Sequence, residues 1–188
     1  MEKYTNFWNL KYNFKETVIE KYEIIFYTLI SFLLPFFIAH PQWLIGIIVN
    51  LFLTKVAFNF KLKTALPVIL FPSLGVLSAG LIFGSNTHFL LYFIPMIWVG
   101  NTIYILTYKF TVFKKNVNKW LSPVISAIVK SLVLFLYALL LVNLFSFPKV
   151  FLIAMGGLQV LTGVVGGYLG VISVHAIYKN KKEIIDYN

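Results

Sequence analysis

Lys130 is the strongest candidate in this sequence for a functional side chain. It lies about nine residues into an apolar stretch, which is about 14 Å along a helix that rises about 1.5 Å per residue. A charge at that depth in a bilayer costs about 2.5–3.5 kcal/mol on insertion scales, so it indicates a functional site by default. We expect Lys130 to line a binding cavity. The alternative is a lysine capped by backbone carbonyls at a helix break.

Polar side chains in four other apolar stretches fall within roughly one helical turn of the same depth. They are Asn50, Ser73, Trp98, Asn101, Gln159 and Thr162. Such side chains often do no more than join helices by hydrogen bonds, but their common depth predicts a cavity around Lys130. A cavity with one lysine and no acid favours an anionic or electron-rich ligand, and Trp and Tyr rings would supply flat surfaces.

The elements that must position these side chains are membrane-spanning helices. Of the 188 residues, 60% are hydrophobic and 12% charged, whereas a soluble domain has about 25% charged residues. This composition excludes a soluble enzyme. Because a bilayer core of about 30 Å needs roughly 20 apolar helical residues, the sequence predicts an all-α integral membrane bundle of six transmembrane helices. The predicted spans are 22–39, 41–60, 64–84, 88–107, 121–146 and 149–178.

The segments outside the spans give the domain organisation. Residues 3–20 alternate aromatic and charged side chains, which predicts an N-terminal amphipathic helix lying in the interface. We therefore expect a cytoplasmic interfacial segment at 1–21, a transmembrane domain at 22–178 and a cytoplasmic tail at 179–188.

The distribution of lysines predicts the topology. All sixteen basic residues are Lys, and thirteen lie on the side that holds both termini and the loops at 61–63 and 108–120. The opposite side holds Lys149 alone, so both termini should be cytoplasmic in a multi-pass protein of the cell (plasma) membrane. Lys55 lies near the cytoplasmic end of the second span, and we expect it to extend to the interface.

The residues that are missing exclude several function classes. Residues 24–182 contain no Asp or Glu, which excludes paired intramembrane carboxylates, and the absence of Cys excludes thiolate chemistry. No phosphate-binding loop, zinc-protease motif or nucleophile elbow occurs. We expect neither an enzyme nor a resident cofactor or metal. Despite a net charge of +10, no nucleic-acid partner is expected, because the lysines lie between apolar runs.

Glycines and prolines indicate how the spans pack. Gly163 with Gly167, and Gly166 with Gly170, have the four-residue spacing that lets a neighbouring backbone approach closely, and Gly80 with Gly84 suggests the same. Prolines within the spans are expected to bend helices and free backbone groups to face a cavity. These are Pro35, Pro67, Pro72 and Pro95.

Four stretches carry a resemblance to a known family. They are His40-Pro41-Gln42 followed by Asn50, and the segments 65–84, 91–101 and 158–167. With six spans and cytoplasmic termini, the chain resembles the substrate-binding S components of energy-coupling-factor (ECF) transporters. The likeness is greatest to a poorly characterised S-component-like group.

The resemblance implies a binding protein without catalytic activity. It would capture a small-molecule nutrient from outside and deliver it to an ECF transmembrane subunit driven by two cytoplasmic ATPases. S components often contact that subunit through an Ala-x-x-x-Ala stripe on span one, where this chain has Ser31, Pro35 and Ala39, so Ser31 and Ala39 are the predicted partner contacts. The predicted substrate-binding residues are Gln42, Asn50, Trp98, Asn101, Lys130, Gln159 and Thr162.

Two other functional hypotheses remain open. The chain could be a non-transporting integral membrane scaffold or accessory subunit whose polar residues only pack helices. More weakly, His40 or His88 at the outer ends of spans could act on lipid or bind a metal, although His175 lies near the other end.

The predicted topology can be tested with single cysteines, because the native chain has none. In intact cells, a membrane-impermeant maleimide should label Lys149→Cys and leave Lys115→Cys unlabelled, and both should react after permeabilisation. Labelling of Lys115→Cys in intact cells would contradict cytoplasmic termini.

Overall fold

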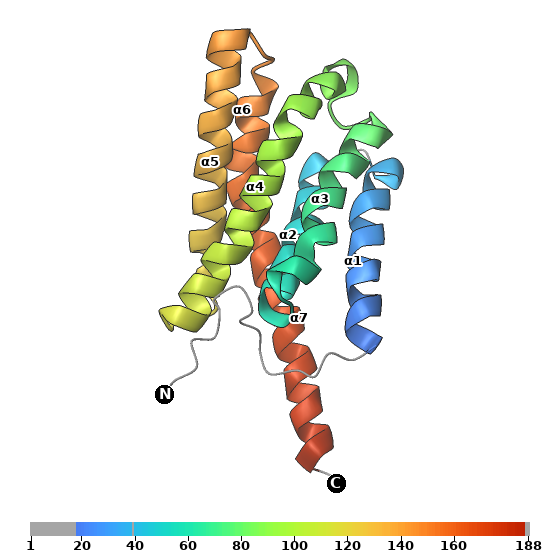
Figure 1. Ribbon diagram of the computed structural model, residues 1–188, viewed down its shortest axis with the longest axis vertical. Coiled ribbons are helices and arrows are strands. Elements are labelled where there is room, and N and C mark those ends of the chain that lie inside the picture. Colours follow the sequence, from blue (N-terminus) through green and yellow to red (C-terminus); the bar gives the residue numbers. More distant parts are fainter. Residues whose placement is uncertain (1–17, 39, 187–188) are drawn as a thin grey trace.

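The computed structural model describes residues 18–38 and 40–186, and side chains within 21–38 and 40–176. All regular elements in this part of the chain are helical (Figure 1). They are α1 (Val18–Phe37), α2 (Gln42–Asn59), α3 (Leu62–Ala79), η2 (Gly84–Phe89), α4 (Leu90–Lys109), η3 (Phe110–Lys114), α5 (Ser122–Phe145), α6 (Val150–Met155) and α7 (Gly157–Asp186).

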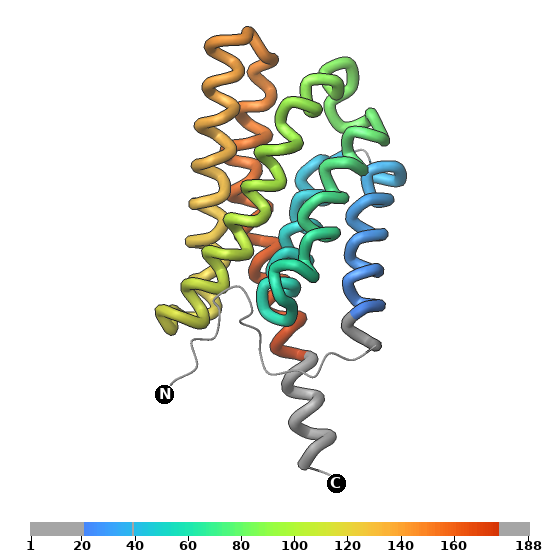
Figure 2. The backbone as a smooth tube through the Cα atoms, in the orientation of Figure 1, coloured from blue at the N-terminus to red at the C-terminus, as the bar shows by residue number. Residues whose placement is uncertain are grey.

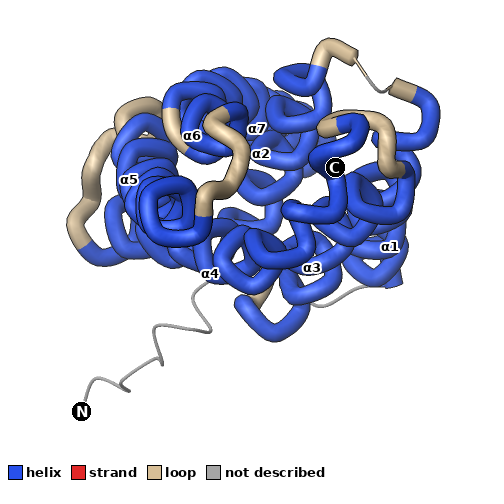
Figure 3. Tube along the Cα trace, turned by 90° about the horizontal axis from the view of Figure 1, so that it is seen from above, coloured by secondary structure: helices blue, strands red, loops and turns tan. Residues whose placement is uncertain are grey.

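The helices make six antiparallel passages along one axis. The described chain begins and ends at the same end of the bundle, at the foot of α1 and of α7 (Figures 1 and 2). In the end view of Figure 3, α2 and α7 lie on one side and α3 and α4 on the other. The most extensive contacts join α2 to α7, α1 to α3, α4 to α5 and α5 to α7. Helix α7 thus lies between α2 and α5.

Length and composition make this a membrane bundle. Five segments are long and apolar enough to cross a bilayer, and α1, with its 20 residues, is a sixth helix of comparable length. Large apolar side chains such as Ile153 and Leu144 are about 70% exposed on the outer surface, as lipid contact requires. The predicted all-α membrane bundle is confirmed. The five segments are Gln42–Asn59, Leu62–Ala79, Gly84–Lys114, Ser122–Phe145 and Val150–Ala176.

Helix α3 ends earlier than expected. Gly80 adopts a left-handed conformation (φ 70°) that stops the helix, and its N–H donates to the Val76 carbonyl. Gly84 also has positive φ, and a Cβ on either glycine would meet no atom within 4 Å. The prediction that Gly80 and Gly84 pack against a neighbour is therefore wrong, because backbone geometry requires them here.

Three other boundaries differ from expectation. The polar loop predicted at 108–120 is helical as far as Lys114, with a π-helical end over Phe110–Lys114. The sixth passage is broken at Gly156, between α6 and α7, where the Ser131 hydroxyl donates to the Gly156 carbonyl at 2.7 Å. Of the predicted interfacial segment, residues 1–17 lie outside the described part, and residues 18–21 already belong to α1.

The glycines of α7 bring α2 into backbone contact. A Cβ on Gly166 would lie 2.3 Å from the Ile47 carbonyl oxygen, and one on Gly170 would lie 2.6 Å from the Thr54 Cβ. No real Cβ tolerates such distances. This close approach therefore needs glycine at both positions.

The second glycine pair does the same for α5. A Cβ on Gly163 would lie 2.7 Å from the Ala127 Cβ, and one on Gly167 would lie 2.5 Å from the Pro123 Cβ. The two pairs are offset by three residues, so they occupy two faces of one helix. The predicted packing role of these four glycines is confirmed.

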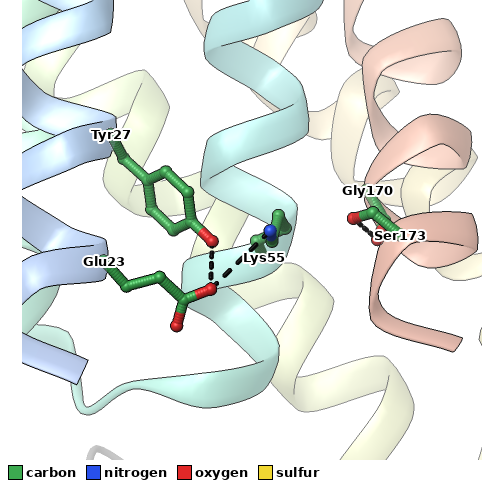
Figure 4. A network of polar contacts seen from close by, with 5 residues as sticks. All are labelled: Glu23, Tyr27, Lys55, Gly170 and Ser173. Atoms are coloured by element: carbon green, nitrogen blue, oxygen red, sulfur yellow. Dashed lines mark hydrogen bonds and ion pairs between the residues drawn. The ribbon is translucent and has the colours of Figure 1, made fainter. Parts of the chain in front are cut away.

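An ion pair fastens α1 to α2 near the end of the bundle where the termini lie (Figure 4). The Lys55 ammonium lies 3.7 Å from the Glu23 carboxylate and 4.8 Å from the centre of the Tyr27 ring, and the Tyr27 hydroxyl donates to Glu23. Tyr27 also stacks on Phe52, with ring centres 4.6 Å apart. Lys55, expected to extend to the interface, is turned instead toward α1, with 13% of its side chain exposed.

Gly166→Ala should lower the free energy of unfolding by about 1–3 kcal/mol, because the new methyl group would force α7 away from Ile47. Gly157→Ala is the matched control, since a Cβ there meets no atom within 4 Å. Thermal unfolding in detergent, followed by circular dichroism, compares the two. Equal stability of both variants would contradict a required close contact between α2 and α7.

Candidate binding cavity

A cavity of about 100 Å³ lies among α2, α3, α4, α5 and the α6–α7 passage. It is in the half of the bundle opposite the described chain ends, since the first residues of α2 and α4 line it. Most of the wall is aliphatic. Its polar lining side chains are Gln42, Asn50, Ser73, Asn101, Lys130, Gln159 and Thr162.

The structure brings together most of the predicted site residues at this cavity. All of them line it except Trp98. Their convergence follows from the rise of the α-helix, because residues counted to equal depth from the ends of antiparallel helices reach the same level. Their role as ligand contacts stays a prediction.

Lys130 is the only lysine among the described residues that line the cavity. Its side chain is 2% exposed, and its Nζ donates to Asn50 Oδ1 at 2.9 Å. The ammonium also lies 5.7 Å from the centre of the Tyr104 ring, within range of a cation–π contact. The acidic side chain that the structure describes, Glu23, pairs with Lys55, so within the described residues Lys130 has no carboxylate partner.

Asn50 links the lysine to α7. Its Nδ2 donates to the Gly46 carbonyl at 2.8 Å and to Thr162 Oγ1 at 3.3 Å. Thr162 Oγ1 donates in turn to the Leu158 carbonyl at 2.8 Å. This chain of contacts joins α5, α2 and α7 at one level, and we call Lys130, Asn50 and Thr162 the polar triad.

A second polar layer lies one turn below the triad. The Tyr104 hydroxyl is 2.9 Å from Thr54 Oγ1 and 3.2 Å from the Gly163 carbonyl oxygen, and both side chains are fully buried. Neither residue is among those predicted from the sequence. Their spacing in the sequence could have indicated them. Thr54 follows Asn50 by four residues and Tyr104 follows Asn101 by three, so each lies on the same helix face as a predicted site residue.

Trp98 joins α4 to α3 by hydrogen bonds instead of lining the cavity. Its indole N–H is directed at α3, where it lies 2.9 Å from Ser73 Oγ and 3.1 Å from the Leu70 carbonyl oxygen. Asn101 Nδ2 donates to the neighbouring Ile69 carbonyl at 3.0 Å. Two side chains of α4 thus donate to backbone carbonyls of α3, those of Leu70 and Ile69. Trp98 thus positions Ser73.

Of the two predicted contacts with a partner subunit, Ser31 and Ala39, the structure describes Ser31. Ser31 is completely buried in the bundle, so a partner helix cannot reach it in this arrangement. Its hydroxyl is a buried group with no hydrogen-bond partner among the described residues. Ala39 lies outside the described residues.

The histidines do not assemble into a site. His40 and His88 are exposed, and the His175 ring lies 3.1 Å from Lys119 Nζ. Within the described ranges, 21–38 and 40–176, no group of three or more His, Cys, Asp or Glu side chains could hold a metal.

No protein-family model, curated protein or solved structure matches this chain. The fold and the cavity define a helical, multi-pass membrane protein with a polar site in its core.

The Lys130–Asn50 contact should appear as a coupling energy between substitutions at the two positions, measured on the free energy of unfolding. Asn50→Ala leaves a buried ammonium without its acceptor and should cost about 1–3 kcal/mol. Adding Lys130→Met should recover part of that loss, with a coupling energy of about 0.5–3 kcal/mol. Reversible unfolding in mixed micelles measures all four proteins. Strictly additive losses would show that the two side chains do not stabilise one another.

Proposed function

We propose that this protein captures a small-molecule nutrient from outside the cell and holds it in the cavity for uptake. In this proposal it serves as the S component of an ECF-type transporter and catalyses no reaction. The observation that carries the proposal is the cavity itself, where polar side chains from four passages surround one buried lysine of a fifth.

The position of the cavity suits capture from outside. It lies in the half of the bundle away from the described chain ends, where Gln42 begins α2 and Leu90 begins α4. With both termini in the cytoplasm, as the lysine distribution predicts, this half faces the exterior.

Unused hydrogen-bonding groups also support a ligand. Among the described residues, the side-chain amides of Gln42 and Gln159 have no protein hydrogen-bond partner, although both groups line the cavity. Both side chains are half-buried, and their amides are available to a molecule in the cavity. A bound molecule would satisfy them.

The proposed partners follow from what the chain lacks. It has no phosphate-binding loop, so uptake driven by ATP requires separate ATPases. By the family resemblance, these are two cytoplasmic ATPases acting through a transmembrane subunit. The burial of Ser31 directs the search for that contact to other lipid-facing positions.

The alternative is a non-transporting scaffold or accessory subunit. One observation favours this alternative. In the polar triad, Asn50 hydrogen-bonds to both Lys130 and Thr162, so three helices are joined without any ligand. In a scaffold those contacts would serve only to fix the helix arrangement.

Filling the cavity should separate the two functions. Protein purified gently from its own membranes should appear in native mass spectrometry with a small-molecule adduct, a second membrane subunit and two ATPases. Leu158→Trp places an indole in the cavity lining and should abolish the adduct without releasing the partners.

Leu161→Trp is the matched control, because Leu161 lies on the same helix but is 52% exposed. It should retain both adduct and partners. Bare native protein, with neither adduct nor partner, would contradict capture for uptake and favour the scaffold.

A further inference from the structure

We infer that the captured molecule is a small organic monocarboxylate, and that its carboxylate is the counterion of Lys130. This inference rests on the proposed function and adds the chemical class of the ligand. Three features of the cavity carry it: the lysine without a counterion, the balance of charge and the apolar wall.

Lys130 has no counterion among the described residues. Lys130 has three N–H donors, and Asn50 Oδ1 accepts one of them. Its other two donors are available inside a lined cavity, and no acid among the described residues approaches them. A buried charge is stable only when it is paired and hydrogen-bonded. A ligand carboxylate would supply both the opposite charge and the acceptors.

The balance of charge limits the ligand to a single negative charge. Lys130 is the one charged side chain among the described lining residues. A dicarboxylate or a phosphate dianion would leave an unpaired negative charge in the membrane core, at a high desolvation cost. A zwitterionic amino acid would bring an ammonium group for which the described lining offers no carboxylate.

The remaining wall suits an apolar body attached to the carboxylate. Val49, Ile97 and Met155 belong to a largely aliphatic lining, and the accessible space is about 100 Å³. The free amide of Gln159 could donate to a second carboxylate oxygen. These features favour a short aliphatic or single-ring acid over an inorganic anion.

Isothermal titration calorimetry on the purified full-length chain in detergent tests the inference. The probes are butyrate, hexanoate, octanoate and benzoate, each compared with its own primary amide, and adipate as a dianion. We expect at least one monocarboxylate to bind, and its amide and adipate to bind at least ten-fold more weakly.

Two variants locate the charge. Lys130→Gln keeps a hydrogen-bond donor but removes the charge, and should weaken carboxylate binding about 100-fold. Lys149→Met removes an exposed lysine and should bind like the native chain. The comparison of carboxylate with amide uses the native protein, so it decides the question even if Lys130→Gln fails to fold.

Three results would overturn the inference: equal affinity for an acid and its amide, unchanged affinity in a folded Lys130→Gln variant, or no binding of any monocarboxylate. Its failure is distinguishable from failure of the proposed function. A neutral or cationic adduct that Leu158→Trp abolishes would leave nutrient capture standing and reject the carboxylate. Absence of any adduct or partner would reject both.

Discussion

The polar contacts that α7 makes beside the cavity depend on how closely this helix lies against α2 and α5. Packed helices are usually about 8–10 Å apart because side chains separate them. Along α7, the glycines remove that separation, so Gly166 meets the backbone at Ile47 and Gly163 meets Ala127. Only at this spacing can side chains as short as Asn50 and Thr162 touch.

The polar triad is a consequence of that spacing. Lys130 has a long side chain, but its acceptor, Asn50, is itself held by Gly46 and Thr162. The break at Gly156 matters in the same way, because it starts α7 at the level of the cavity and so brings Gln159 into the lining. Packing, charge and binding space in this bundle are therefore parts of one arrangement.

Much of the candidate site could be predicted because depth in a membrane is a matter of counting. A constant rise per residue places Asn50, Asn101, Lys130 and Gln159 at one level without knowledge of the neighbours. Counting does not tell which way a side chain turns. Trp98 lies at the same depth, yet its N–H is directed at α3, where Ser73 Oγ and the Leu70 carbonyl accept it. That choice depends on a helix that is distant in sequence.

The six helical passages follow from the sequence alone, since bilayer thickness sets their length. The glycine spacing that selects two faces of α7 is also visible in the sequence. The environment of each lysine depends instead on tertiary packing. Lys55 pairs with Glu23, Lys109 donates to the Phe60 carbonyl, and Lys130 meets only neutral groups among the described residues. The three side chains are chemically identical. They differ because a buried charge takes whichever partners the neighbouring helices bring within reach, and packing alone sets those neighbours.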